Sequence, residues 1–223
     1  MQPNLLAMAI SAISKDITLE EFRAKSGIAG KTMARYVLDY LVKHGIGESF
    51  RHCYSFSNED RMKLAVLALQ SGTDIEMISK SLSWQDFEAF ASQLLNLSGY
   101  VAECNLNFSK PSRMQIDVVG INYDSRLAIV VDCKHWKRNN LSLISSYARK
   151  QAQRTSVLLL QIRKKISRAI PVILTLYSMD MRLVGGVPVV PIVKFNSFIK
   201  DVPLHISKIK VISANSVPND VPW

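Results

Sequence analysis

Three charged side chains lie inside two apolar stretches of the chain, in the segment QIDVVGINYDSRLAIVVDCKHWKR at residues 115–138. Asp117 belongs to the first stretch, and Asp132 and Lys134 belong to the second. The apolar residues around them are typical of buried strands, where a carboxylate is costly unless it is paired or binds a metal ion. Two aspartates and a lysine at this spacing therefore indicate a site with a chemical role.

The predicted turn between the two strands places the aspartates opposite each other. If the chain turns about residues 124–125, Val119 pairs with Val130 and Asp117 pairs with Asp132, with Cβ atoms about 4.5–5.5 Å apart. Like charges at that separation repel, so a compensating cation is needed. A turn with an odd number of residues would instead shift the register by one and put the carboxylates on opposite faces of the sheet.

Lys134 lies two residues after Asp132 and therefore shares its face of the strand. Two carboxylates, a main-chain carbonyl and waters are the oxygen ligands that Mg²⁺ prefers, and Mn²⁺ is expected to substitute. Such an ion would polarise a phosphate oxygen and help to make hydroxide from water, while Lys134 would orient that water and stabilise charge on the phosphate. The alternative is that Asp117 and Lys134 form an ion pair between strands and that Asp132 caps the strand or faces solvent.

Positive charge is concentrated in the second part of the chain. The net charge of +10 divides into +1 for residues 1–83 and +9 for residues 84–223, and residues 133–179 contain no acidic side chain. A segment of one sign is expected to bind a polyanion, here a nucleic acid; the alternative is a solvated helix face. The candidate DNA-binding residues of this part are Lys137, Arg138, Arg149, Lys150 and Arg154.

The N-terminal part has the pattern of two helices and a small hairpin. Thr18 is a suitable N-cap for a short helix that ends near residue 26, a second helix is expected over residues 30–44, and IGESFRHCYSFS then alternates as a hairpin does. This part resembles a winged-helix domain, which implies that its second helix presents Lys31 and Arg35 to DNA. Winged helices also serve in dimerisation and protein docking, so a homodimer or a protein partner stays open.

The second part of the chain alternates between helical and extended patterns. From residue 84 the predicted order is a helix, three strands in a meander, a basic helix over about residues 141–168, and a further strand. The whole chain is therefore expected to be α+β, with a helical N-terminal part and an α/β C-terminal part.

These elements and their acidic residues resemble the PD-(D/E)XK nuclease superfamily, which has the restriction-endonuclease-like fold. The resemblance covers about residues 84–195 and is strongest to Mrr-type restriction enzymes and archaeal Holliday-junction resolvases. The matching positions are Glu88 in the helix, Asp117 in the first strand, and Asp132 and Lys134 in the next. It implies that all four are catalytic and that Glu88 joins the two aspartates as a ligand of Mg²⁺.

The resemblance also implies a polar residue on the following helix, for which Gln151 and Gln153 are both candidates. The proline that gives the motif its name is replaced by Ile116, a departure that the superfamily tolerates. With the resemblance, the expected domains are a winged-helix-like domain with linker helices at residues 1–83 and a nuclease-like domain at residues 84–223.

The expected function is metal-dependent hydrolysis of phosphodiester bonds by a DNA endonuclease, in repair, recombination or restriction. One alternative is a DNA-binding or regulatory module with a nuclease fold that does not cut. Another is a nuclease subunit that is active only with a partner. The three scattered cysteines favour a reducing compartment. Neither they nor the dispersed histidines have the spacing of a zinc site. No apolar run is long enough to span a bilayer. We therefore expect a cytoplasmic protein with no membrane partner.

Overall fold

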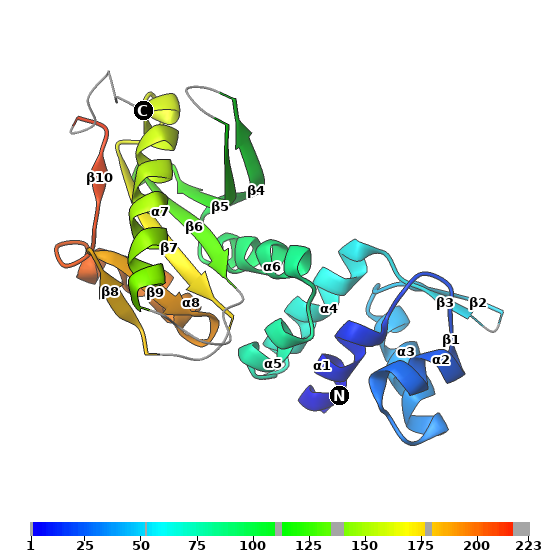
Figure 1. The fold of residues 1–223 in the computed structure, drawn as a ribbon. Coiled ribbons are helices and arrows are strands. Elements are labelled where there is room, and N and C mark those ends of the chain that lie inside the picture. Colours follow the sequence, from blue (N-terminus) through cyan, green and yellow to red (C-terminus); the bar gives the residue numbers. More distant parts are fainter. Residues whose placement is uncertain (1, 52, 110–112, 135–140, 177–179, 216–223) are drawn as a thin grey trace. The chain divides into compact units, whose positions relative to one another are not determined.

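The computed structural model describes all residues except 1, 52, 110–112, 135–140, 177–179 and 216–223. The chain forms two compact units, residues 1–86 and 87–223, each of which is described by itself (Figure 1). The first unit contains α1 (Pro3–Ala12), β1 (Ile17–Thr18), α2 (Leu19–Ser26), α3 (Lys31–Lys43), β2 (Glu48–Phe50), β3 (Cys53–Ser55), α4 (Asn58–Gln70) and α5 (Ile75–Lys80).

Helix α2 begins and ends where its sequence predicts. The Thr18 side chain accepts a hydrogen bond from the Glu21 main-chain N–H, and the Glu21 carboxylate accepts one from the Thr18 N–H, which forms a capping box. Gly27 ends the helix in the left-handed conformation, with a φ of 71°. Helix α3 follows, and β1, β3 and β2 form a small antiparallel sheet in that order. Assignment of this unit to the winged-helix class stays a prediction.

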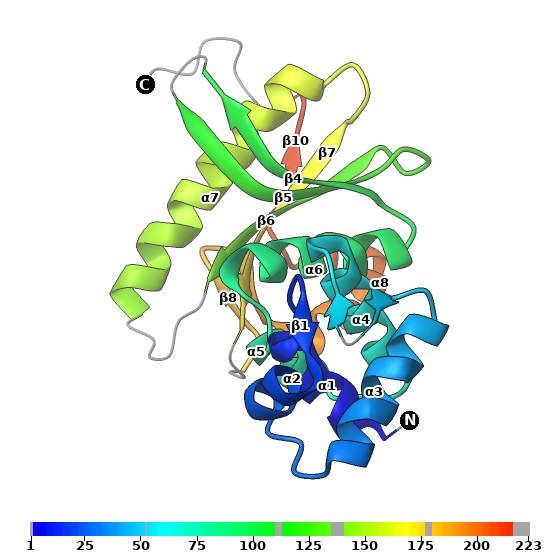
Figure 2. The ribbon, with the colours of Figure 1, turned by 90° about the vertical axis from the view of Figure 1, so that its right-hand side faces the viewer.

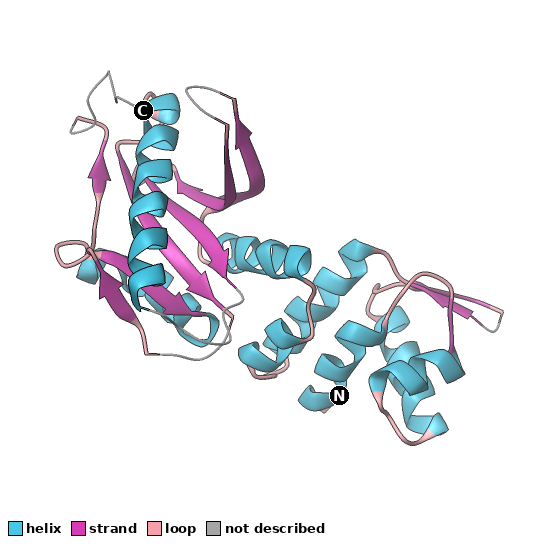
Figure 3. Ribbon diagram, in the orientation of Figure 1, coloured by secondary structure: helices cyan, strands magenta, loops and turns pink. Residues whose placement is uncertain are grey.

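The second unit is built on a seven-stranded mixed sheet. Its elements are α6 (Trp84–Leu97), which includes the boundary between the units, β4 (Val101–Phe108), β5 (Met114–Asn122), β6 (Leu127–Lys134), α7 (Leu141–Ile162), β7 (Arg168–Thr175), β8 (Arg182–Val184), β9 (Val187–Pro191), α8 (Ile192–His205) and β10 (Ile212–Ser213). The strand order is β4-β5-β6-β7-β9-β8, and β10 pairs with β7. Helix α7 covers one face of the sheet, and α6 and α8 cover the other (Figures 2 and 3).

This architecture confirms the α+β class and extends the predicted order of elements. Strands β4, β5 and β6 form the expected antiparallel meander, while β7 and β9 add in parallel to β6 and β7. The prediction that the basic helix continues to residue 168 is wrong, because α7 ends at Ile162. Ile166 is buried in the core, and the Ser167 N–H donates to the Arg126 carbonyl at 2.9 Å. These contacts begin β7 instead of continuing the helix.

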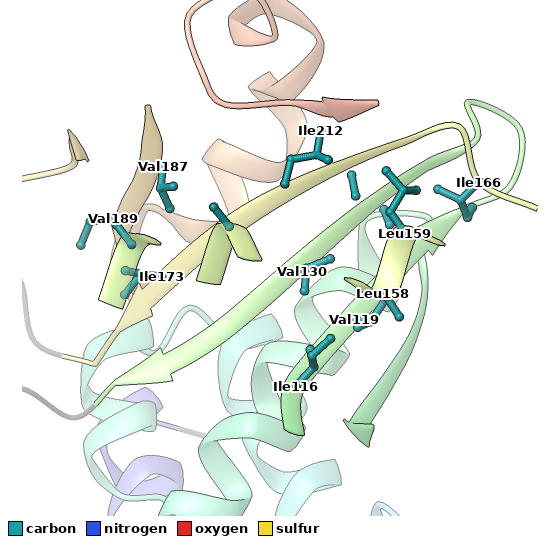
Figure 4. Packing of buried hydrophobic residues seen from close by; sticks show 14 of the residues in the cluster. Ile116, Val119, Val130, Leu158, Leu159, Ile166, Ile173, Val187, Val189 and Ile212 are labelled. Atoms are coloured by element: carbon teal, nitrogen blue, oxygen red, sulfur yellow. The ribbon is translucent and has the colours of Figure 1, made fainter. Parts of the chain in front are cut away.

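The main core of the second unit lies between the sheet and α7. Val119 and Val130 from the meander meet Leu159 of α7 and Ile173 of β7, all of them buried (Figure 4). In this register Val119 and Val130 face α7, and a shift by one residue would turn them to the opposite face of the sheet. Residues 119 and 130 are paired as the sequence predicts.

Candidate active site

Asp132 is the most buried charged group of the site and has two cationic neighbours. Its side chain is on β6, and only 2% of the residue is exposed. The Lys134 ammonium lies 2.8 Å from Asp132 Oδ2, and the Arg154 guanidinium on α7 donates to Oδ1 at 3.0 Å. Both cations are themselves partly shielded from water, so this ion-pair cluster compensates the charge that burial would otherwise make costly.

One oxygen of Asp132 lacks a hydrogen bond in spite of its close ion pair. Oδ2 is buried and accepts no hydrogen bond, because Lys134 Nζ is near it but outside hydrogen-bonding geometry. The ammonium donates instead to the Cys133 carbonyl at 3.3 Å and lies 5.2 Å from the centre of the Tyr147 ring. A buried carboxylate oxygen with an unused lone pair is a suitable ligand for a hard cation.

Asp117 lies where β5 and β6 separate. The paired positions of the two strands end at Val118 and Val131, one step before the predicted pair of aspartates. At this point Asp117 Oδ2 accepts a hydrogen bond from the Cys133 N–H at 2.8 Å. The side chain thus takes the main-chain donor that β6 presents at the end of the ladder.

The pKa of Asp117 is affected by the charge of Asp132. Burial raises the pKa of Asp117, and the charge of Asp132 raises that pKa further, against the opposing hydrogen bond from Cys133 and the charges of Lys134 and Arg154. The direction of this second effect agrees with the predicted repulsion between the two aspartates. Lys134, however, makes its ion pair with Asp132 on its own strand, not with Asp117 across the strands.

Glu88 approaches the sheet from the face opposite α7. It is buried on α6, with 4% exposed, and its main-chain carbonyl accepts from Cys104 Sγ at 3.7 Å. Burial raises the pKa of the Cys133 thiol, and the charges of Asp117 and then Glu88 raise it further. Within the described ranges, no three His, Cys, Asp or Glu side chains are grouped closely enough to hold a metal ion. The predicted ligand set of three carboxylates is thus not assembled in this conformation.

The structure distinguishes the two candidate glutamines on α7. Gln151 is buried, and its Nε2 donates to the Val130 carbonyl on β6 at 2.8 Å, whereas Gln153 is exposed. Tyr147, Gln151 and Arg154 follow one another at helical spacings of four and three residues, so they share the flank of α7 that faces β6.

The predicted DNA-binding residues fall into different environments. Arg149 and Lys150 are exposed on α7. Arg154 instead contacts Asp132, a role that sequence reasoning missed, although its position three residues after Gln151 carried the signal. In the first unit, Lys31 pairs with Glu20 at 3.0 Å and Arg35 is exposed. The remaining two, Lys137 and Arg138, lie outside the described residues.

The oxygen atoms at the end of β6 are of the type that a divalent cation prefers. Asp132 Oδ2, the Asp117 carboxylate and the Cys133 carbonyl are hard oxygen ligands on adjoining strands. Two carboxylates and one carbonyl leave coordination positions for the waters that Mg²⁺ keeps.

Among the helices that the structure describes, none is long and apolar enough to cross a membrane.

Comparison with known proteins finds a family match around this site. Residues 79–146 match the family model Mrr_cat, described as a restriction endonuclease, and no curated protein matches the chain. Protein VC1899 from Vibrio cholerae is similar over 92% of this chain and 51% of its own, with 10% identity and a TM-score of 0.39. Can2 from Sulfobacillus thermosulfidooxidans, solved with cyclic tetra-adenylate, is similar over 80% and 42%, with 13% identity and a TM-score of 0.28. The chain thus spans about half the length of these two proteins.

Proposed function

We propose that the protein is a metal-dependent DNA endonuclease, on the premise that the match of residues 79–146 to a restriction endonuclease family supports membership of the PD-(D/E)XK nuclease superfamily. The observation that carries the proposal is the buried Asp132, which lies beside Asp117 and holds Lys134 at one oxygen. Asp117, Asp132 and the Cys133 carbonyl would hold Mg²⁺, and Mn²⁺ would substitute. Glu88, from the opposite face of the sheet, would enter the ligand set only after a local rearrangement.

The hydrolysis divides between the bound ion and the residues of this chain. A bound ion would supply Lewis acidity at a phosphate oxygen and lower the pKa of a coordinated water. The Lys134 ammonium would orient the attacking water through a hydrogen bond. It would also stabilise the oxygens that gain negative charge as the phosphorus–oxygen bond to the leaving alcohol breaks. Arg154 would hold the Asp132 carboxylate in its orientation before the ion binds, through its hydrogen bond to Oδ1. Gln151 would hold β6 against α7 through its bond to the Val130 carbonyl.

A second candidate function is a DNA-binding module that does not cut. Two observations favour it: Asp132 is already compensated by Lys134 and Arg154, and the three predicted carboxylate ligands are not grouped together among the described residues. In this case the basic α7 would bind DNA while the carboxylates stabilise the fold. A role in repair, recombination or restriction is part of the proposal for the first candidate only.

One experiment decides between the two functions. Supercoiled plasmid and branched DNA are incubated with the wild type, Asp132→Asn and Lys134→Ala in Mg²⁺, Mn²⁺ or EDTA, and thermal melts follow metal binding in parallel. We expect metal-dependent cutting by the wild type, and a loss of at least about 100-fold in Lys134→Ala with the metal-induced rise in Tm retained. Asp132→Asn is expected to lose both cutting and the rise in Tm. DNA binding without cutting in any metal would select the second function.

A further inference from the structure

A hollow lies on the flank of α7 away from the carboxylates, beside the hairpin of β8 and β9. Its volume is about 250 Å³. Its apolar floor is formed by Ala148, Ala152, Val184 and Val187. Two exposed cations, Arg149 and Lys210, form its rim. None of the residues that line it belongs to the site of Asp117, Asp132 and Lys134, so it is a separate feature of the second unit.

The shape of the hollow follows from small residues and a fixed turn. Ala148 and Ala152 lie one helical turn apart and leave space that a longer side chain would fill. Gly185 and Gly186 turn the hairpin with φ angles of 58° and 79°. The Lys210 N–H donates to the Gly186 carbonyl at 2.7 Å, which holds the Lys210 main chain against the turn. The hollow is therefore built from well-anchored elements.

The charge and size of the hollow restrict what it can bind. No acidic side chain lines it, and neither Arg149 nor Lys210 makes an ion pair with any described residue. Two exposed, unpaired cations above an apolar floor suit an anionic group attached to a small apolar body. The volume is below the range of about 300–1,000 Å³ that whole small-molecule ligands occupy. It suits one unit of a longer ligand.

Cations on α7 connect the carboxylate site with this hollow. Arg154 contacts Asp132 on one flank of the helix. Lys150 lies one helical turn before Arg154 and is exposed. Arg149, the residue before Lys150, lies at the rim of the hollow. A strand of DNA that leaves the carboxylates would meet these positive charges in order as it crosses α7. An acidic protein segment would not need to contact the carboxylate site, so it would have no reason to follow the cations from that site to the hollow.

We propose that the hollow anchors one nucleotide unit of the DNA substrate, with its phosphate between Arg149 and Lys210 and its deoxyribose on the apolar floor. The inference rests on the proposed function and deepens it, because it extends the DNA footprint across α7 to the hairpin of β8 and β9. The contact needs no metal, so it can be measured apart from cleavage.

The test measures the affinity of the full chain for a fluorescent duplex in EDTA at several salt concentrations. The variant Arg149→Gln/Lys210→Gln should bind more weakly, and its log–log salt slope should be smaller by about 1.8, since each phosphate contact contributes about 0.9. The matched control is Lys194→Gln/Lys200→Gln, which removes two exposed charges from α8 on the other face of the sheet. The control should keep the wild-type slope. Equal effects of the two double variants would overturn the proposal.

A second variant tests the space of the hollow independently of its two charges. Ser145 also lines the hollow and is only partly buried, so Ser145→Phe fills the space without changing any charge. It should weaken binding at every salt concentration while melting like the wild type, and wild-type affinity would overturn the proposal. Failure of the proposed function would be seen differently, as loss of metal-dependent cutting in a protein whose DNA affinity still depends on Arg149 and Lys210.

Discussion

At the scale of single residues, the site is governed by the compensation of one buried charge. The sequence predicts two repelling aspartates that need a metal ion, and the pKa of Asp117 is indeed raised by burial and by Asp132. The structure adds two protein cations, Lys134 and Arg154, at the oxygens of Asp132. A metal ion would therefore enter an environment that is already partly neutral, and it would meet repulsion from both cations.

Arg154→Ala tests this compensation. Without metal, the variant should lose about 1–3 kcal/mol of unfolding free energy, because a buried carboxylate oxygen loses a charged hydrogen-bond donor. The rise in Tm on adding Mg²⁺ should become larger than in the wild type, because one competing positive charge is gone. Thermal melts with and without Mg²⁺ measure both effects.

Lys150→Ala is the control for Arg154→Ala. It removes the same charge from the exposed surface of the helix one turn earlier, and its stability should stay within about 0.5 kcal/mol of the wild type. If the two variants respond alike to Mg²⁺, Arg154 does not compete with the ion.

At the scale of elements, the site depends on how two helices pack against the meander. Helix α7 brings Gln151 and Arg154 to β6, and α6 carries Glu88 on the opposite face. Gly120 on β5 allows the close approach of α6, since a Cβ atom there would lie 3.0 Å from Leu95 Cδ1. The position of α6, and with it that of Glu88, therefore depends on a residue without a side chain.

Gly120→Val tests this close approach. The added side chain should force Leu95 aside and destabilise the protein by about 1–3 kcal/mol. Leu95→Ala alone should also destabilise it, by about 2–5 kcal/mol, but the double variant should be more stable than the sum of the two by about 0.5–3 kcal/mol. Denaturant unfolding of the four proteins completes the cycle. Strictly additive losses would show that Gly120 and Leu95 do not share this space.

In the first unit, a hydrogen bond between the hairpin and α3 has a pH signature. The Tyr54 hydroxyl on β3 donates to Asp39 on α3 at 2.7 Å. Burial, followed by the bond to Asp39, raises the pKa of Tyr54 to about 12. Because this pKa lies above the unfolded value of about 10, the stabilisation is complete below pH 10 and is lost as the pH rises towards 12.

The prediction is that the wild type loses more unfolding free energy between pH 10 and pH 12 than Tyr54→Phe does. Denaturant unfolding across this range measures the difference, and absorbance of the phenolate follows the titration directly. Asp39→Asn should lower the pKa of Tyr54, because it removes the negative charge beside the hydroxyl. A Tyr54 that titrates near pH 10 in the wild type would contradict the assignment.

At the scale of the whole molecule, charge separates the two units more clearly than any motif does. Residues 1–86 hold ten basic and ten acidic side chains, whereas residues 87–223 hold eighteen and eight and so carry the whole net charge of +10. In the first unit, moreover, Lys31 is already paired with Glu20. The long-range attraction of DNA should therefore come from the second unit.

Salt dependence tests this division of charge. Lys31→Gln/Arg35→Gln should reduce the log–log salt slope of DNA binding by less than about 0.9, because an ion-paired lysine releases little counterion on binding. Arg149→Gln/Lys150→Gln on α7 should reduce it by about 1.8. Fluorescence anisotropy at several salt concentrations gives both slopes. A larger effect of the first pair would mean that α3 is a main DNA contact.

The sequence alone was sufficient for features that depend on neighbours along the chain. The capping box and Gly27 determine α2, because their hydrogen bonds and backbone conformation are local. The pairing of Val119 with Val130 follows from the short turn and the apolar alternation, since both depend only on residues that are close along the chain. The α+β class follows from the order of such elements.

Contacts between residues distant along the chain were decided only by the tertiary structure. Arg154 reaches Asp132, and Gln151 reaches β6 where Gln153 does not, because the rotation of α7 on the sheet selects which flank faces the strands. The meander ladder ends before the two aspartates because the Asp117 side chain takes the Cys133 N–H, a competition that strand periodicity does not encode. Helix α7 ends early for the same kind of reason: burial of Ile166 and pairing with β6 stabilise a strand where local sequence favours a helix.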